Sequence, residues 1–214
     1  MTSPLSVSGR EARATRIDPN RRAFCYGILL TSVLPSTLAF ARQRDLASPS
    51  MAGVTILIVR HAEKPASGPD LSPAGRARAA AYARYFNPFN GRAGGSFTPD
   101  LLIASTDTTK SDRPELTLKP LSAAIGLRID THFANHEEKA LAEALRSTAH
   151  GKHILIAWHH GRIARLIHAL GGDPDAILPG GNWPGSVYDW VVELSYDSNG
   201  RLIDARKIME NLPS

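Results

Sequence analysis

Arg60 and His61 are the first residues of this chain whose types suggest chemistry. They come directly after residues 54–59, a continuous run of β-branched and aliphatic side chains. Such a run is typical of a strand buried in a parallel sheet. In open α/β sheets, ligands bind beyond the carboxyl ends of the strands, which is where this pair lies. Taken alone, the pair fits two solvated polar residues at a strand end equally well.

Two further apolar runs end in the same way. Residues 153–158 are followed by His159 and His160, and residues 101–104 are followed by a polar segment that leads to Arg113. Parallel strands would bring these side chains to one edge of a sheet. The planar fork of Arg suits bidentate binding of phosphate, and a neutral imidazole is a competent nucleophile toward phosphorus. The residue types therefore indicate a site for a dianionic tetrahedral group.

The elements that must position these side chains follow an alternating pattern. Strand-like runs alternate with helical patterns from residue 54 onward, which predicts an α/β fold, a three-layer sandwich with a mostly parallel central sheet. Ser72 and Pro73 are typical of a helix start. The other expected elements are helices near 111–125, from Asn135 and over 161–170, a third strand at 128–130, a Gly-rich loop at 91–97, and a closing hairpin of residues 187–196 and 202–208.

The charge of the chain is concentrated near its N-terminus. The chain has 214 residues and a formal net charge of +5, and residues 1–44 hold seven of the 25 Lys and Arg but only two of the 20 acidic residues. Residues 45–214 are therefore neutral overall, and no nucleic-acid partner is expected. Cys25 is the one cysteine, so neither an intramolecular disulfide nor a cysteine zinc site is expected.

Residues 1–41 have the pattern of a secretory signal peptide. Arg21 and Arg22 precede a moderately apolar stretch that ends at Ala39-Phe40-Ala41, and the paired arginines are typical of twin-arginine export. We expect a linker at 42–53 and one folded domain at 54–214. The protein would then be periplasmic or secreted, without stable membrane insertion after cleavage. Translation from Met51 would instead leave it in the cytoplasm.

Four segments together resemble the histidine phosphatase superfamily, also called phosphoglycerate mutase-like proteins, and its small phosphatase branch in particular. They occur in the family's order and span most of the expected domain. Residues 59–65 (Val-Arg-His-Ala-Glu-Lys-Pro) resemble the Arg-His motif and 71–75 the Leu-Thr/Ser-x-x-Gly helix start. Residues 113–121 resemble the Arg-Ala-x-Gln-Thr-Ala-x-Pro-Leu segment, with Leu116 in place of its Gln, and 158–163 the second-His motif.

The resemblance implies a phosphatase that acts on a phosphate ester or a phosphohistidine. His61 would form a covalent phosphohistidine, which water then hydrolyses, while Arg60, Arg113 and the second His stabilise the phosphoryl oxygens. No metal and no cofactor are expected. The substrate would be a phosphorylated small molecule or a phosphoprotein, with Lys64 as a further binding residue; the oligomeric state is left open.

The second catalytic His is either His159 or His160. The family's usual form has His directly before Gly, which favours His160, whereas counting back from Ile163 allows His159. We take His160 as the catalytic residue and His159 as a substrate-binding neighbour.

The group that protonates the leaving group is the least determined. The resemblance suggests an acid between the two catalytic strands, and we take Glu138, with Glu137 and Asp189 as alternatives. Asn135 with Glu138 three residues later is also the pattern of a helix capping box, which would give Glu138 a purely structural role.

Two other functions remain open. A non-catalytic module that binds phosphate or a phosphopeptide would use the same fold, but such modules usually lose one of the His or Arg residues. A phosphoglycerate mutase-type phosphotransferase fits less well. The mutases of this family have Gly-Glu/Gln-Ser after the first His, where this chain has Ala62-Glu63-Lys64.

Overall fold

The computed structural model describes residues 51–91, 95–149 and 151–212. The predicted signal peptide and nearly all of the predicted linker lie outside these residues. Within the described part of the chain, no helix is both long enough and apolar enough to cross a membrane.

A six-stranded sheet forms the centre of the described region, with the strand order β5-β4-β6-β1-β7-β8. The first four of these strands are mutually parallel, and β7 and β8 are antiparallel to their neighbours, which agrees with the predicted mostly parallel sheet. The strands are β1 (Thr55–Arg60), β4 (Leu101–Ala104), β5 (Ile129–Asp130), β6 (His153–Trp158), β7 (Trp190–Tyr196) and β8 (Leu202–Met209).

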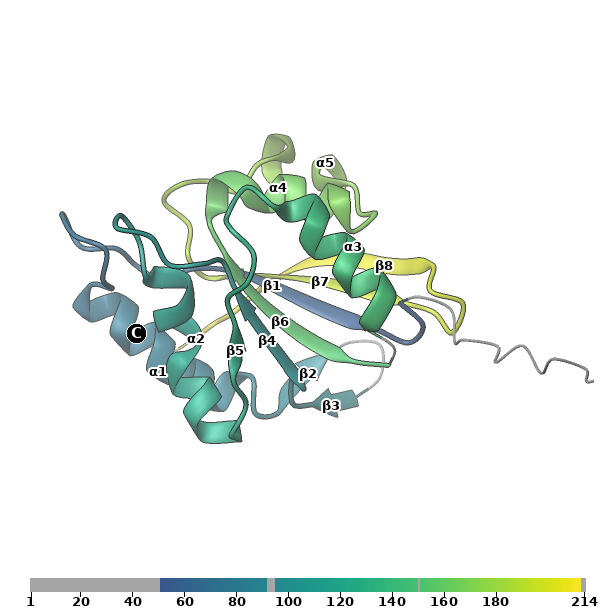
Figure 1. The fold of residues 1–214 in the computed structure, drawn as a ribbon, viewed down its shortest axis with the longest axis horizontal. Coiled ribbons are helices and arrows are strands. Elements are labelled where there is room, and N and C mark those ends of the chain that lie inside the picture. The colour runs from purple at the N-terminus through teal and green to yellow at the C-terminus, as the bar shows by residue number, and fades with distance from the viewer. Residues whose placement is uncertain (1–50, 92–94, 150, 213–214) are drawn as a thin grey trace, which may run out of the picture. The chain divides into compact units, whose positions relative to one another are not determined.

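Helices cover both faces of this sheet. In Figure 1, α1 and α2 lie on one side of it, and α3, α4 and α5 lie on the other. Their bounds are α1 (Pro73–Tyr85), α2 (Arg113–Ile125), α3 (Glu138–Thr148), α4 (His160–Ala169) and α5 (Pro174–Ile177); a short 3-10 helix, η1 (Pro179–Gly181), follows α5. The predicted three-layer α/β sandwich is confirmed.

The continuous apolar pattern of β1 follows from these two layers. Ile56 and Ile58 belong to the core cluster that contains the inner faces of α3 and α4, whereas Leu57 and Val59 belong to the cluster under α1 and α2. Successive side chains of a strand point to opposite faces, so a strand covered on both sides must be apolar throughout. A central strand of this kind holds the residue that follows it, His61, in a fixed position.

Two local expectations were wrong. The Gly-rich segment expected as a loop contains a small antiparallel pair of strands, β2 (Phe89–Gly91) and β3 (Gly95–Phe97). The capping box of Asn135 and Glu138 does not form either. Glu137 is the residue that precedes α3, and its Oε2 accepts a hydrogen bond from the Ala134 N–H over 2.8 Å.

Candidate active site

The register of two strands brings His61 and His159 together. In the parallel pair β1 and β6, Arg60 lies opposite Trp158, so the next residue of each strand lies at the same level. The His61 N–H donates to the Trp158 carbonyl over 2.9 Å, which continues the ladder by one residue. The two imidazole rings meet edge to face, with 5.0 Å between their centroids.

The His61 ring is oriented by its own loop. Nδ1 and the carbonyl oxygen of Ala62 are 2.7 Å apart, so Nδ1–H donates and Nε2 is the unprotonated nitrogen. The side chain is only 3% exposed. Burial lowers the pKa of His61 to about 3, and the positive charges of Arg60 and Arg113 act in the same direction. His61 is therefore neutral at pH 7, as a nucleophile must be.

Arg60 is held by the segment that leads into β7. Its Nη1 donates to the carbonyls of Gly185 and Val187 over 2.7 and 2.8 Å, and its guanidinium carbon lies 3.6 Å from the centre of the Tyr188 ring. Trp183 is buried and donates from its Nε1 to the same Val187 carbonyl over 2.9 Å. Trp183 thus fills the loop and fixes the carbonyl that orients Arg60.

Arg113, the first residue of α2, is fixed by backbone carbonyls. Its Nη1 donates to Gly68 and Pro69 over 3.0 and 3.1 Å, and its Nη2 donates to Lys110 over 3.2 Å. Among the described residues, neither its Nε–H nor that of Arg60 has a hydrogen-bond partner, although both atoms are buried. Buried donors are nearly always paired, so two orphaned guanidinium N–H groups suit a bound anion.

Thr117 connects α2 to the loop of His61. Its hydroxyl donates to the Arg113 carbonyl over 2.7 Å and accepts from the Ala62 N–H over 2.8 Å. Thr117 is fully buried. Thr117 lies in residues 113–121, which resemble a family motif, but its role in holding the loop of His61 was not predicted from the sequence. The signal was its place four residues after Arg113, one helical turn along α2.

His159, rather than the expected His160, is the imidazole beside His61. His160 is the first residue of α4, and its ring approaches Gly185, where a Cβ atom would lie 3.4 Å from Nε2. Burial lowers the pKa of His159 to about 4, with the Arg113 charge as the next cause. The prediction of His160 as the second catalytic residue does not fit this arrangement. It relied on the position of His160 directly before Gly161, whereas the pairing of β1 with β6 determines which His lies beside His61.

The predicted imidazole and guanidinium residues all line one cavity of about 320 Å³. Lys64, predicted to bind substrate, lines it as well. Asn135 and Arg162 also line the cavity, although neither was predicted as a site residue. The complete lining consists of Arg60, His61, Lys64, Arg113, Asn135, His159, His160, Gly161 and Arg162.

None of the described residues that line this cavity is Asp or Glu. Glu138 is buried and pairs with Arg162, with 3.4 Å between Oε1 and Nη1, and both Glu138 and Glu137 line a neighbouring cavity between α3 and α4. Asp189 lines a third cavity beside Glu63. The structure therefore does not place any of the three candidate proton donors in the cavity of His61.

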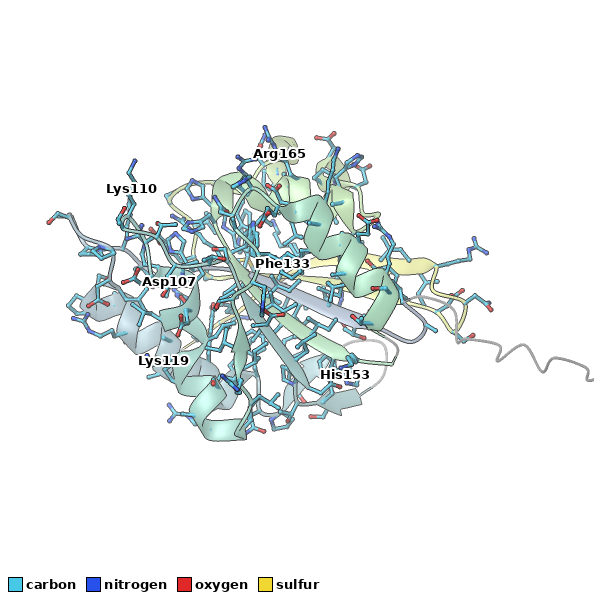
Figure 2. All side chains as sticks on the ribbon, viewed as in Figure 1. Asp107, Lys110, Lys119, Phe133, His153 and Arg165 are labelled. Atoms are coloured by element: carbon cyan, nitrogen blue, oxygen red, sulfur yellow. The ribbon has the colours of Figure 1, made fainter. Side chains whose placement is uncertain are left out.

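The segment between β4 and α2 lies at the margin of the site. Figure 2 shows Lys110 pointing outward from this segment, with Asp107 nearer to α2. Burial raises the pKa of Asp107 to about 6, and a hydrogen bond with Glu115 acts in the same direction. Neither Asp107 nor Lys110 lines the cavity of His61.

A buried network holds the loop after His61 from its other side. Glu63 accepts hydrogen bonds from Arg78 Nε, at 3.0 and 3.1 Å to its two oxygens, and from Arg78 Nη2 at 2.8 Å. Arg78 Nη1 also donates to Glu210 over 2.6 Å, and Tyr82 donates to the same carboxylate over 2.5 Å. Burial raises the pKa of Glu210 to about 7. This network, Glu63–Arg78–Glu210–Tyr82, gives Glu63 the role that the sequence left unassigned.

No protein-family model matches the sequence, and no curated protein matches it. Solved structures do match. A protein assigned as the phosphohistidine phosphatase SixA of Agrobacterium tumefaciens is 22% identical, with a TM-score of 0.46, over 71% of this chain and 96% of that one. Mycobacterial glucosyl-3-phosphoglycerate phosphatase is 19% identical, with a TM-score of 0.47, over 74% and 99%.

Phosphoglycerate mutase from Plasmodium falciparum is 15% identical, with a TM-score of 0.46, and the match covers 76% of this chain and 95% of that one. These three neighbours are members of the histidine phosphatase superfamily, the family that the sequence motifs resemble. The identities bear on the fold alone, so the chemistry must be argued from the cavity itself.

Proposed function

We propose that this chain is a phosphatase of the histidine phosphatase superfamily that hydrolyses a phosphate ester or a phosphohistidine through a phosphohistidine on His61. One observation carries the proposal. A buried, neutral imidazole, with its Nδ1 fixed by the Ala62 carbonyl, lines a cavity together with two guanidinium groups whose Nε–H donors are unsatisfied among the described residues. An imidazole in this state can attack phosphorus, and the two guanidinium groups suit the phosphoryl oxygens.

In the first step, the Nε2 lone pair of His61 attacks phosphorus and forms an N–P bond. The bond from phosphorus to the leaving atom breaks, and that atom keeps the electron pair. Arg60, Arg113 and His159 donate hydrogen bonds to the phosphoryl oxygens, whose charge they stabilise in the transition state. The guanidinium groups supply the positive charge, so the proposed step uses no metal ion.

In the second step, water attacks phosphorus on the phosphohistidine. The N–P bond breaks, its electrons return to Nε2, and the water proton leaves with phosphate or to solvent. Since no described carboxylate lines the cavity and His159 is neutral, the leaving group takes its proton from water. This route favours substrates whose leaving group departs readily, such as a phenolic oxygen or a phosphohistidine ring that water has already protonated, and it needs no proton from Glu138.

The wild-type protein should hydrolyse an aryl phosphate without added metal and in the presence of a chelator. His61→Ala should lower kcat by roughly a thousandfold or more, because the nucleophile is lost. Quenching a single turnover of wild type in alkali should trap phosphate that is labile to acid and stable to alkali, and peptide mapping should locate it on His61.

Glu138→Gln is the matched control for this test. It keeps the shape of the side chain, and because Glu138 lies outside the cavity, kcat should stay within about threefold of wild type. A loss as large as that of His61→Ala would restore Glu138 as the proton donor. If wild type binds inorganic phosphate but gives no turnover between pH 5 and pH 8, the chain is a phosphate-binding module instead.

The location of the protein is a separate proposal. We infer export through the twin-arginine pattern at Arg21 and Arg22, followed by cleavage after Ala41, on sequence grounds alone. N-terminal sequencing of the protein from its native host should find a start near Arg42. A start at Met51 in the cytoplasm would overturn export.

A further inference from the structure

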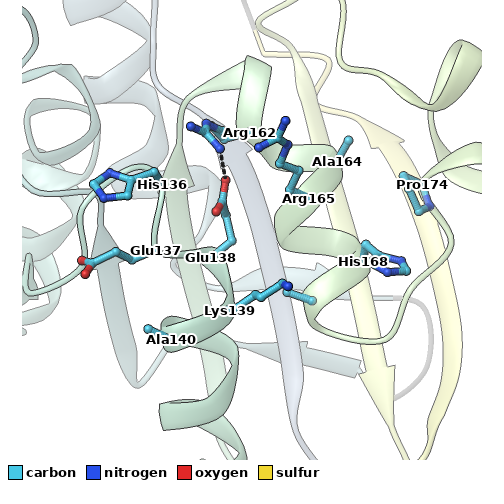
Figure 3. A pocket seen from close by; sticks show the side chains of 11 residues that line it. His136, Glu137, Glu138, Lys139, Ala140, Arg162, Ala164, Arg165, His168 and Pro174 are labelled. Atoms are coloured by element: carbon cyan, nitrogen blue, oxygen red, sulfur yellow. Dashed lines mark hydrogen bonds and ion pairs between the residues drawn. The ribbon is translucent and has the colours of Figure 1, made fainter.

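Arg162 lies at the border of two cavities. It lines the cavity of His61 and also the larger one between α3 and α4, which has a volume of about 610 Å³. Figure 3 shows Arg162 next to Glu138, with Arg165 on the same helix. A cavity of this size accommodates a small-molecule ligand, and at Arg162 it borders the cavity of His61.

Glu138 orients Arg162 without using all of its donors. The carboxylate is 5% exposed, and its one contact with the guanidinium, from Nη1 to Oε1, measures 3.4 Å. Charge-assisted hydrogen bonds of this type are usually 2.7–2.9 Å long, and a guanidinium has five N–H donors. The buried carboxylate therefore attracts Arg162 through a weak contact and leaves most of its donors for a ligand.

The lining of the cavity of His61 contains more positively charged side chains than the binding of one phosphoryl group requires. Arg60, Arg113 and the imidazoles of His61 and His159 account for the phosphoryl group. Lys64 and Arg162 remain, and of the described residues in the lining none is acidic. Glu138 compensates the charge of Arg162 only in part, through one contact of 3.4 Å, so Lys64 and Arg162 together favour a ligand with a further negative charge.

We propose that Arg162 determines specificity by binding a second anionic group, a carboxylate or a phosphate, on the leaving group of the substrate. The rest of the leaving group lies in the α3–α4 cavity. This inference rests on the proposed function, since it takes the phosphoryl group to lie at His61. It narrows the substrates to phosphorylated compounds with at least two acidic groups.

Phosphonates test the inference without any turnover. Methylphosphonate carries one acidic group, whereas phosphonoacetate and 3-phosphonopropionate add a carboxylate at increasing distance. Calorimetric titration of wild type should show that the better of the two carboxylated compounds binds roughly ten- to a hundredfold more tightly than methylphosphonate. Arg162→Gln, which keeps a donor for Glu138, should reduce this ratio to about two, whereas Arg162→Lys should keep part of it.

Arg84→Gln is the matched control, because Arg84 is an exposed residue of α1 that lines neither the cavity of His61 nor the α3–α4 cavity. It should keep the wild-type ratio, and methylphosphonate should bind all four proteins with similar affinity. Equal affinity of wild type for methylphosphonate and both carboxylated compounds would overturn the inference alone, as would a ratio unchanged by Arg162→Gln. If no phosphonate binds wild type, the proposed function fails as well.

Discussion

At the scale of single residues, the proposed role of His61 as nucleophile depends on burial. His61 is surrounded by protein and by positive charge, so protonating it costs free energy in the folded state that it does not cost in the unfolded chain. The same burial that prepares His61 for attack therefore makes the folded protein sensitive to acid.

This sensitivity has a defined sign and pH window. The pKa of His61 is about 3 when folded, against an ordinary value of 6.5, so the folded state binds fewer protons between these values. The free energy of unfolding should therefore fall as pH drops below 6.5, by about 3 kcal/mol at pH 4 from this residue. Urea unfolding at pH 7, 5.5 and 4 measures this fall.

His61→Asn serves as the reference, since it keeps an N–H near the Ala62 carbonyl but has no group that titrates in this range. Its free energy of unfolding should fall less than that of wild type between pH 7 and pH 4. Identical pH dependence of the two proteins would mean that His61 titrates normally and is not the neutral nucleophile described above.

Single residues also mark the limit of what the sequence predicts. Arg60, His61 and Arg113 could be predicted to lie together because residue type and strand-end position are both visible in the sequence, and they do line one cavity. The choice between His159 and His160 is not visible in the sequence, because it depends on the pairing of β1 with β6, which places Arg60 opposite Trp158. Proximity to Gly161 suggested the wrong neighbour for His61, and only the pairing register corrects it.

At the scale of elements, the predictions were correct where the residue pattern of a helix or strand depends only on its own residues. The buried strands β1 and β6 are continuous apolar runs, and Ser72 caps α1 by accepting from the Gly75 N–H over 3.1 Å. They failed at the start of α3, where the capping pattern of Asn135 and Glu138 is overridden. There Glu138 instead packs against Arg162 of α4, a tertiary contact that local pattern cannot reveal.

Gly75 shows how tightly α1 packs on the loop of the nucleophile. A Cβ atom there would lie 2.4 Å from the Glu63 carbonyl oxygen. Helix propensity alone predicts that Gly75→Ala stabilises by about 1 kcal/mol, but the overlap should reverse this and destabilise by about 1–3 kcal/mol. Thermal or urea unfolding decides between these signs, and kcat/KM should fall because Glu63 lies two residues after His61.

Gly161→Ala is the stability control for this change. Gly161 is the second residue of α4, and a Cβ atom there would have no neighbour within 4 Å among the described residues. It should follow helix propensity and leave stability equal or higher. Stabilisation by Gly75→Ala as well would show that the helix moves away from Glu63 without cost.

At the scale of the whole described region, the Glu63–Arg78–Glu210–Tyr82 network joins the first strand to the end of the last. Arg78→Met should destabilise by about 1–3 kcal/mol, because the buried Glu210 loses its cation and a hydrogen-bond partner and becomes protonated. It should also lower kcat/KM, since Glu63 loses its partner. Urea unfolding and steady-state kinetics on the same preparation measure both effects.

Arg76→Met is the comparison on the same helix. Its ion pair with Asp70 is exposed on both sides, with 3.4 Å between the charged atoms, and such pairs contribute at most about 1 kcal/mol. A small effect at Arg76 with a large one at Arg78 would attribute the loss to burial. Equal effects would mean that the network does not support the loop of the nucleophile.

The position of β1 has a consequence for protein synthesis. β1, which directly precedes the proposed nucleophile His61, pairs on both sides with strands that are synthesised much later, β6 and β7. A growing chain therefore contains His61 long before His159 has been synthesised. The same is true of Gly185 and Val187, whose carbonyls accept hydrogen bonds from Arg60. The ribosome-bound chain should have no turnover until β7 has emerged, and a fragment released before that point should be catalytically silent.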